Sequence, residues 1–249
     1  MLTFEKALVL GASSGIGEAI ALELARGGAS VALAARRLAE LERVAAAIGL
    51  LGRGTARAYA HDVRSWDEAP ELFERICADL GGLDLVVYAA GVMPEIAESE
   101  YDFPKDRQMV EVNLLGAMAW FNLAGARFEA QRSGTLIGIS SVAGERGRRG
   151  NPGYGTSKAA LTAYLESLRN RLSRYGVNVV TIKPGFVDTA MTRGKKGLVG
   201  MISADRAAKR TLALARRGSS ASGFVPGGWA LVAGVLRNIP SFVFRRLNI

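Results

Sequence analysis

The sequence predicts one α/β domain in which a parallel sheet is doubly wound, with helices on both of its faces. Three observations lead to this fold class. Short apolar runs alternate with segments whose apolar residues recur at helical spacing, glycines or Pro-Gly pairs end several of these segments, and 49% of the 249 residues are hydrophobic, enough for one sizeable core. Because parallel neighbours need crossover connections, the alternation of strand and helix favours a parallel sheet.

The first half of the chain predicts four strands and three helices. Apolar runs indicate the strands, and apolar residues at helical spacing indicate the helices that follow them. A capping box, Ser65 with Glu68, is expected to open the third helix. The expected strands are 7–10, 30–35, 55–60 and 83–88, and the expected helices run over about 16–26, 38–48 and 65–80.

The second half continues the alternation. A long helix is expected over about 105–130, a strand over 135–140, a helix over about 154–175 and a strand over 177–183. Ser203 is expected to cap a helix that runs to about Arg217, and the last strand lies near Phe224, so that one domain spans 1–228. Residues 188–203 are either a lid over a ligand or an ordinary surface excursion, and their place in the order of elements favours the lid.

Composition excludes several classes of protein. The one cysteine, Cys77, cannot form an intrachain disulfide, and one cysteine and one histidine are too few for a zinc site, so no metal is expected. A Ser-His-Asp hydrolase would depend on His61, at the end of an expected strand, and is disfavoured. The N-terminus lacks a leader pattern and no window reaches the length of a membrane-spanning helix, which predicts a cytoplasmic protein.

Charge is divided unevenly along the chain. Residues 1–140 carry 13 basic and 19 acidic side chains, whereas residues 141–249 carry 19 basic and 4 acidic ones. The basic second part could attract an anionic substrate, a phosphate-rich cofactor or an anionic membrane surface, or it could be a solvated surface without a specific role. No nucleic-acid-binding motif is present, so no nucleic-acid partner is expected.

Gly11, Gly15 and Gly17 stand between the first expected strand and the first expected helix. Glycines at this place allow a tight turn and let the backbone approach a pyrophosphate at a helix N-terminus, as in Rossmann-type domains. A glycine-rich turn that merely ends a strand is the alternative, but this placement favours nucleotide binding.

Two arginines, Arg36 and Arg37, follow the second expected strand, where a dinucleotide site usually offers a carboxylate to the adenine ribose. A guanidinium can pair with a 2′-phosphate, whereas a carboxylate would repel it. The sequence therefore predicts NADP(H) in preference to NAD(H). The alternative is that these arginines are surface residues at the start of the next helix and bind no cofactor.

Tyr154 and Lys158 lie four residues apart, in line with Leu161 and Leu165, so both are expected to point inward from one helix. A phenol is a poor acid or base at neutral pH, but a nearby ammonium favours its phenolate form and brings its proton transfer into a useful range. Taken alone, a Tyr-x-x-x-Lys pattern is best explained by a structural role. The residues around it are what favour a catalytic role.

The ordered set of these positions resembles the short-chain dehydrogenase/reductase family, in its branch of short single-domain subunits, and the resemblance covers nearly the whole chain. It rests on Gly11, Gly15, Gly17, Asp62, Ala90, Gly91, Asn113, Ser141, Tyr154, Lys158, Pro184 and Gly185. It implies an NADP(H)-dependent oxidoreductase that reduces a ketone or oxidises an alcohol, and we expect a homo-oligomer, either a dimer or a tetramer.

The resemblance also implies a role for each position. Tyr154 would protonate the carbonyl oxygen of the substrate as hydride arrives, and Ser141 would hydrogen-bond that oxygen. Lys158 would bind the nicotinamide ribose and lower the pKa of Tyr154, and Asn113 would hold a water between the lysine and solvent. The other cofactor contacts would be Gly11, Ser13, Ser14, Gly15, Ile16 and Gly17 at the pyrophosphate, Arg36 and Arg37 at the 2′-phosphate, Asp62 and Val63 at adenine, and Ala90, Gly91, Pro184, Gly185, Val187 and Thr189 towards the nicotinamide.

Two departures from the family pattern are visible. Leu10 stands where the family usually has threonine, and Tyr88-Ala89 stands where it has a pair of asparagines. Hydrogen bonds lost there would loosen this end of the sheet by about 1 kcal/mol each. The catalytic set itself is intact, which weighs against a non-catalytic NADP(H) sensor or a membrane-associated scaffold, the alternatives to an enzyme.

The segment 229–249 reads as an amphipathic C-terminal tail. Apolar residues recur at helical spacing from Trp229 and are followed by aromatic residues and by Arg245 and Arg246. Such a segment suits a peripheral contact with the inner face of the membrane, a subunit interface or the rim of the active site, and all three stay open. The charged run 145–149, just after Ser141, and the ending 239–249 are together similar to the polyprenyl-phosphoryl 2-keto-pentose reductases. This resemblance implies a lipid-linked or other hydrophobic or anionic carbonyl substrate.

Overall fold

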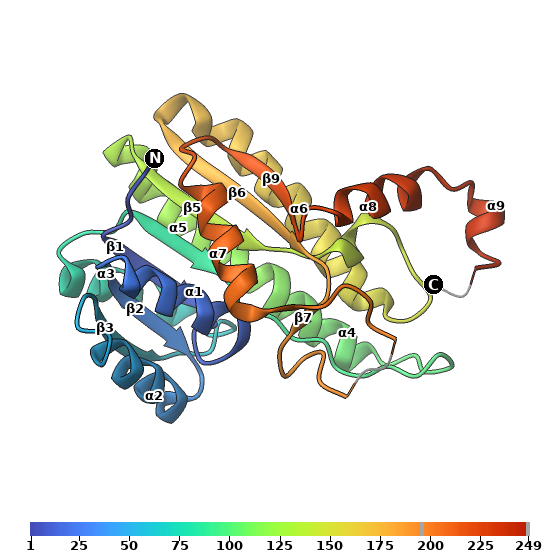
Figure 1. The fold of residues 1–249 in the computed structure, drawn as a ribbon, viewed down its shortest axis with the longest axis horizontal. Coiled ribbons are helices and arrows are strands. Elements are labelled where there is room, and N and C mark those ends of the chain that lie inside the picture. Colours follow the sequence, from blue (N-terminus) through green and yellow to red (C-terminus); the bar gives the residue numbers. More distant parts are fainter. Residues whose placement is uncertain (195–196, 248–249) are drawn as a thin grey trace.

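The computed structural model describes residues 1–194 and 197–247, and its central feature is a parallel sheet (Figure 1). Within these residues the sheet has seven strands in the order β3-β2-β1-β4-β5-β6-β9. The strands are β1 (Lys6–Leu10), β2 (Ser30–Ala35), β3 (Thr55–Ala60), β4 (Leu85–Tyr88), β5 (Gly134–Ile139), β6 (Val177–Pro184) and β9 (Ala221–Val225). Every neighbouring pair is parallel, so the predicted fold class is confirmed.

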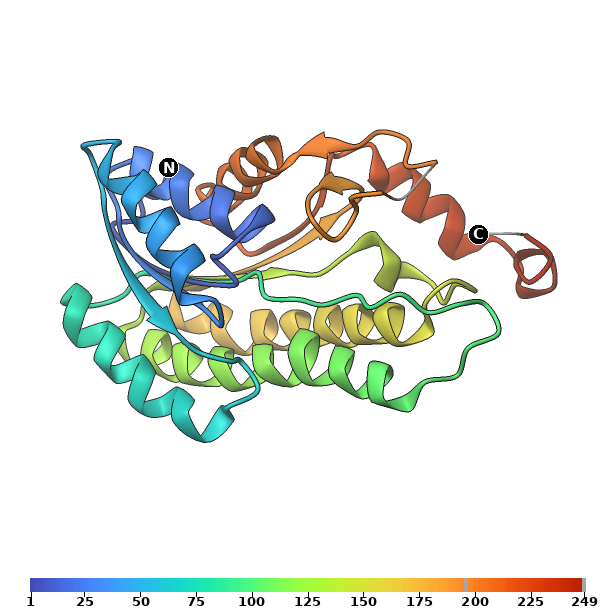
Figure 2. The same cartoon turned by 90° about the horizontal axis from the view of Figure 1, so that it is seen from below.

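Helices cover both faces of the sheet, as the edge-on view of Figure 2 shows. One face carries α1 (Gly15–Arg26), α2 (Leu38–Gly49) and α7 (Ala204–Ala215). The other carries α3 (Ala69–Leu80), α5 (Gly116–Gln131) and α6 (Pro152–Leu172). The remaining elements are α4 (Phe103–Val110), the π-helical turn η2 (Glu111–Leu115), the 3₁₀ turns η1 (Trp66–Glu68), η3 (Val142–Glu145) and η4 (Ser173–Tyr175), the short strands β7 (Val187–Asp188) and β8 (Ile202–Ser203), α8 (Trp229–Asn238) and α9 (Ser241–Phe244).

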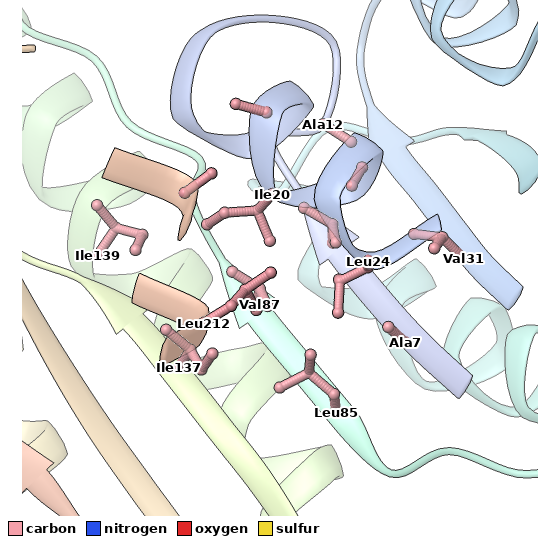
Figure 3. Close-up of a cluster of buried hydrophobic side chains, with 14 of the residues drawn as sticks. Ala7, Ala12, Ile20, Leu24, Val31, Leu85, Val87, Ile137, Ile139 and Leu212 are labelled. Carbon is pink, nitrogen blue, oxygen red and sulfur yellow. The ribbon is translucent and has the colours of Figure 1, made fainter. Parts of the chain in front are cut away.

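Two hydrophobic cores follow from the alternation of side chains along buried strands. In β1, Ala7 and Val9 belong to the core under α1 and α7, whereas Leu8 and Leu10 belong to the core on the other face. Figure 3 shows Ile20 and Leu24 of α1 and Leu212 of α7 near Val87 of β4. Each fully buried side chain of this size stabilises the fold by about 1.5–3 kcal/mol. The sheet is therefore a rigid base for the loops at the carboxyl ends of its strands.

The order of the strands reverses at β1, which lies between β2 and β4. The chain leaves β1 towards one side of the sheet and later returns to its other side. The loops that follow β1 and β4 consequently diverge and leave a crevice at the carboxyl ends of these strands, which is where ligands bind in open α/β sheets.

Several local predictions were wrong at their boundaries. The Ser65 side chain makes no capping hydrogen bond, because the chain first forms the 3₁₀ turn η1, in which the Ser65 backbone carbonyl accepts from the Glu68 amide. The expected long helix is interrupted by the π-helical turn η2. The helix expected from Tyr154 begins at Pro152, because the Asn151 side chain accepts a hydrogen bond from the Tyr154 amide and caps it. The cap by Ser203 is confirmed, since its hydroxyl accepts from the Arg206 amide.

The segment expected to be a lid is anchored at both ends by the pairing of β7 with β8. Lys195 and Lys196 of this segment, and Asn248 and Ile249 of the predicted tail, lie outside the described residues. α8 begins at Trp229, the first residue of that tail, and together with α9 it lies at the end of the molecule opposite the N-terminus (Figures 1 and 2). Among the described helices, none combines the length and apolar character needed to cross a bilayer.

Candidate active site

A cavity of about 1150 Å³ opens at the carboxyl ends of the strands. Nearly all residues that the sequence assigns to the site line it, and Gly17 and Asn113 lie just behind its wall. The lining includes Gly11, Ser13, Ser14, Gly15, Ile16, Arg36, Arg37, Asp62, Val63, Ala90, Gly91, Ser141, Tyr154, Lys158, Pro184, Gly185, Val187 and Thr189. Residues scattered over the sequence therefore meet in one space, which is larger than a typical small-molecule pocket.

The glycine turn after β1 forms one end of the cavity, and its backbone approaches other chain segments too closely for side chains. Gly11 has a φ of +85°, and a Cβ there would lie 2.5 Å from the Ala90 amide nitrogen. A Cβ on Gly17 would overlap the Gly11 carbonyl oxygen. The turn thus holds the N-terminus of α1, with its free amides, against the cavity, and this cradle fits a diphosphate.

Two arginines after β2 stand at the same end. Arg37 donates hydrogen bonds to the Ser13 and Ser14 hydroxyls, at 3.0 and 3.1 Å, and so braces the glycine turn. Arg36 is exposed to the cavity. The nearby Asp62 forms a two-pronged pair with Arg64, and this pair, helped by the charge of Arg36, lowers the pKa of Asp62. Arg36 thus presents its guanidinium to the cavity. The charge of this guanidinium has only a small effect on the pKa of Asp62.

Lys158 lies at the other end of the cavity and is almost completely buried. Its ammonium donates a 2.9 Å hydrogen bond to the Ile139 carbonyl and lies 5.8 Å from the centre of the Tyr154 ring. Burial lowers the pKa of Lys158 to about 8. The amine is therefore poised to exchange a proton near neutral pH.

The expected effect of Lys158 on Tyr154 is not found in this structure. Burial raises the pKa of Tyr154, and only the neighbouring Ser141 hydroxyl opposes this shift. The lysine turns towards the Ile139 carbonyl, and the phenol is partly buried in the cavity wall. The Ser141 hydroxyl itself accepts a hydrogen bond from the Ala143 amide, which fixes its position at the end of β5.

Asn113 is completely buried in the turn η2, behind the cavity wall. Its amide nitrogen donates to the Val92 carbonyl and to the Ser157 hydroxyl, both at 3.0 Å, and its oxygen accepts from the Val92 amide. Ser157 in turn donates to the Tyr154 carbonyl. The asparagine therefore fastens the loop after β4 to the helix that carries Tyr154 and Lys158.

His61 is buried between elements and does not act with a serine. Its ring packs edge-on against Trp120, with centroids 5.2 Å apart, and burial lowers its pKa. No hydrogen bond joins it to a serine in the described parts of the chain, so the disfavoured hydrolase triad does not form. Nor do residues 1–194 and 197–247 contain a cluster of three metal-ligating side chains.

Sequence reasoning missed a clamp that holds the C-terminal tail beside the cavity. The fully buried carboxylate of Glu145 pairs with Lys183 at 2.9 Å and with Arg237 of α8. Arg146 donates to the Leu236 carbonyl at 2.6 Å and lies over the Phe244 ring. These contacts join segments remote in sequence, and the only sequence signal was the charged run after Ser141.

The first residue of the tail reaches the cavity wall itself. Trp229 packs edge-on against Phe186, with ring centroids 5.2 Å apart, and its indole fills the space where Gly185 would otherwise carry a Cβ. Both Gly185 and Phe186 line the cavity. The inner side of α8 is therefore docked at the rim, one of the three places considered for the tail.

This chain is similar to known proteins in sequence and in structure. The family model described as short chain dehydrogenase matches residues 5–197. An uncharacterized oxidoreductase of Myxococcus xanthus is 38% identical over 194 residues, which cover 77% of this chain and 75% of that protein. One from Staphylococcus aureus strain USA300 is 36% identical over 192 residues, covering 77% and 82%. The solved structure of a short-chain type dehydrogenase/reductase from Mycobacterium marinum is 27% identical, with a TM-score of 0.79, and covers 88% of this chain and 93% of that one.

Proposed function

This chain belongs to the short-chain dehydrogenase family, and on that premise we propose that it is an NADPH-dependent reductase of a carbonyl compound. One observation carries the proposal: the glycine cradle and the group of Ser141, Tyr154 and Lys158 line the same cavity. A dinucleotide held at the cradle and a substrate held at the hydroxyls would share this space, as hydride transfer requires.

The residues of the chain supply alignment and a proton, whereas bound NADPH supplies hydride to the carbonyl carbon. Tyr154 donates its phenolic proton to the carbonyl oxygen, which takes the electron pair of the C=O π bond and becomes the alcohol. Ser141 donates a hydrogen bond to the same oxygen and stabilises its developing charge. Burial raises the pKa of Tyr154, so the phenol holds its proton at neutral pH and gives it up to the strongly basic oxygen that develops on hydride transfer.

Lys158 and Asn113 support this step in different ways. Lys158, with a pKa of about 8, exchanges protons readily and would restore the proton of Tyr154 after turnover. It would also hydrogen-bond the nicotinamide ribose. Through its hydrogen bonds to Val92 and Ser157, Asn113 holds the loop after β4 and α6 in a fixed relative position beside the reacting groups.

We also propose that the enzyme prefers NADP(H) to NAD(H). Arg36 lines the cavity at the end of β2, where its guanidinium is free to pair with a 2′-phosphate. No carboxylate of β2 stands there to receive a ribose hydroxyl, since the strand ends in Ala34-Ala35.

The variant Tyr154→Phe tests the assignment. It should bind NADPH with unchanged affinity, measured by the fluorescence of the cofactor, but should lose turnover of carbonyl substrates by more than about a hundredfold. Equal turnover in the variant would contradict the proposed acid. Firm NADPH binding without oxidation of NADPH by any member of a broad carbonyl panel would instead favour a non-catalytic sensor.

For the outer side of the tail, we propose a peripheral contact with an anionic lipid surface. Leu231, Val235 and Phe242 are 79%, 65% and 61% exposed, and the exposed Arg245 and Arg246 follow them. Apolar side chains beside arginines suit the boundary between headgroups and acyl chains. Such a contact would bring a lipid-linked substrate to the rim at which Trp229 packs.

A double substitution, Leu231→Gln with Val235→Gln, tests the lipid contact without removing the docked side of α8. It should reduce sedimentation of the protein with phosphatidylglycerol vesicles. Leu50→Gln, at a 90% exposed residue after α2, is the control and should leave sedimentation unchanged. Unchanged sedimentation of the double variant contradicts the proposal, and loss of a dimer in that variant would assign the face to a second copy of the chain.

A further inference from the structure

One cation of the cavity has no assigned use. Arg148 lies in the loop between η3, which follows Ser141, and the start of α6, which carries Tyr154. Within the described residues its guanidinium makes a single long hydrogen bond, 3.4 Å from Nη2 to the Val142 carbonyl, and its Nε is buried without an acceptor there. Because a guanidinium has five N–H donors, most of its capacity is unused.

The other cations that line the cavity are engaged or serve the cofactor end. Lys105 pairs with Glu100, and Arg37 holds the two serines of the glycine turn. Lys158 is bonded to the Ile139 carbonyl. Arg148 differs because it is partly buried at the substrate end and has no ion pair within residues 1–194 and 197–247.

Carboxylates near the loop do not neutralise this charge. Glu145 is committed to Lys183 and Arg237, and Glu98 pairs with the neighbouring Arg149. Glu95 also lines the cavity, but it is exposed and forms no ion pair with Arg148 in the described chain. Consistent with this, burial alone shifts the pKa of Arg148, and shifts it downwards.

An arginine held in this way is unfavourable until an anion reaches it. Removing a guanidinium from water without a compensating acceptor destabilises the folded chain, and an oxoanion that accepts two parallel N–H bonds relieves that cost on binding. Apolar residues supply much of the remaining wall, among them Met93, Ile96, Val142, Phe186 and Met191.

We propose that Arg148 binds an oxoanionic group of the carbonyl substrate, a carboxylate or a phosphate ester, an inference that rests on the reductase function proposed above. The carbonyl oxygen lies at Ser141 and Tyr154, the oxoanion lies at Arg148, and the apolar wall covers the carbon chain between or beyond them. The substrate class is therefore an anionic, partly apolar ketone or aldehyde rather than a neutral one.

Matched pairs of substrates test this inference. Acetoacetate, 4-oxopentanoate and 5-oxohexanoate are compared with their methyl esters, and dihydroxyacetone phosphate with dihydroxyacetone, by following NADPH absorbance. In Arg148→Gln, the KM of the anionic members should rise about ten- to hundredfold, whereas the KM of the neutral members stays within about twofold. Arg148→Lys should reverse part of the rise in KM, because lysine keeps the positive charge but cannot donate two parallel N–H bonds to the oxoanion.

Arg149→Gln is the control, because it removes the same charge from the next residue, which pairs with Glu98 and lines a separate hollow beside α9. It should leave every KM unchanged. Equal changes in the two variants, or a wild-type protein that does not prefer anionic members over their neutral counterparts, would overturn the inference.

A binding measurement separates failure of this inference from failure of the reductase function. Titration of 4-oxopentanoate into the protein without NADPH, followed by calorimetry, should show binding that Arg148→Gln weakens and Arg149→Gln does not. Such binding without turnover of any carbonyl would retain the anion site and refute the reductase. Turnover of neutral carbonyls that is independent of Arg148 would instead retain the reductase function and refute the anion site.

The source of the oxoanion is decided by a further pair of substrates. A keto-alkyl phosphate with a long hydrocarbon chain, presented in neutral detergent, is compared with dihydroxyacetone phosphate. A lower KM for the long-chain compound, lost in Arg148→Gln, indicates a membrane lipid, whereas a lower KM for the short compound, lost in the same variant, indicates a free metabolite. A KM that Arg148→Gln leaves unchanged for both compounds would overturn the inference.

Discussion

The Tyr88 hydroxyl donates a 2.5 Å hydrogen bond to the Val112 carbonyl, inside the π-helical turn that carries Asn113. Tyr88 ends β4 and is fully buried, and burial raises its pKa, so the phenol is a permanent donor. The family pattern led us to expect lost hydrogen bonding at this position, and the Tyr88 hydroxyl supplies a hydrogen bond there. Leu10, the other departure, is simply a fully buried core residue.

We predict that Tyr88→Phe lowers the free energy of unfolding by about 1–3 kcal/mol, because it leaves the Val112 carbonyl buried without a donor. Urea denaturation measures the change. Tyr164→Phe is the control, since it removes a hydroxyl that bonds to Asn122 at the exposed surface, and its effect should stay below about 0.5 kcal/mol. Equal losses in the two variants would show that the bond does not support the turn.

Much of the fold followed from the sequence because periodicity reports directly on burial. Most strands and helices lie within a few residues of their expected places, since buried strands such as β1 and β4 are nearly continuous apolar runs. The π-helical turn could not be predicted, because the contacts made there are long-range ones: the Tyr88 hydroxyl bonds to the Val112 carbonyl and leaves no room for a side chain at Gly116. Long-range contacts of this kind leave no periodic signal.

The same distinction explains the candidate site. Residues on the loops after β1, β2 and β5 could be predicted, because strand order places all carboxyl ends at one edge of the sheet. The roles of Arg148 and of the Glu145 clamp could not be predicted. They depend on which charged side chains the fold brings together and which it leaves without an ion pair. The lowered pKa expected for Tyr154 is not found for a related reason: spacing gives the proximity of Lys158 but not the direction of its ammonium, which bonds to the Ile139 carbonyl.

Gly17→Ala should impair the glycine cradle. The added methyl group would overlap the Gly11 carbonyl and push α1 from the turn, which should lower the free energy of unfolding by about 1–3 kcal/mol. Binding of NADPH, measured by cofactor fluorescence, should weaken at least about tenfold because the diphosphate loses its closest backbone amides. Gly49→Ala is the control, since nothing lies near that position at the end of α2. Unchanged binding in Gly17→Ala would remove the cradle from the cofactor site.

Arg36→Gln should change the choice of cofactor. We expect the Kd for NADPH to rise about ten- to hundredfold, because a charged, two-pronged pair with the 2′-phosphate is lost, while the Kd for NADH stays the same. Arg43→Gln removes the same charge from α2, where Arg43 pairs with Glu18 and Glu40, and should affect neither constant. Parallel losses for NADPH and NADH would mean that Arg36 does not contact the distinguishing phosphate.

Lys158 should make stability depend on pH in a defined window. Its folded-state pKa of about 8 lies below the unfolded value of 10.5, so between these values the unfolded chain binds the extra proton and stability rises with pH. The free energy of unfolding of the wild type, minus that of Lys158→Met, should increase by about 3 kcal/mol from pH 8 to 10.5 and stay constant below pH 7. Subtraction cancels the titration of the tyrosines. A constant difference across the window would show that the ammonium is hydrated.

The clamp on the tail should depend more on its buried ion pair than on its exposed one. Glu145→Gln removes the charge that compensates the nearly buried Lys183, and breaking a buried pair in this way costs about 3–5 kcal/mol. Arg237→Gln removes the other ion pair of Glu145, but the Arg237 side chain is 53% exposed, so its loss should cost less than about 1 kcal/mol.

The two variants should also differ at the cavity rim. Because Glu145 and Arg146 hold α8, and Trp229 at the start of α8 packs on Gly185 and Phe186, loosening the helix exposes both the tail and the wall of the site. Glu145→Gln should therefore be cleaved faster in α8 by a protease under native conditions, and should show raised KM values for the carbonyl substrate as well as lower stability. Rapid cleavage with unchanged KM would separate the tail from the site, and equal stability of the two variants would contradict the buried pair.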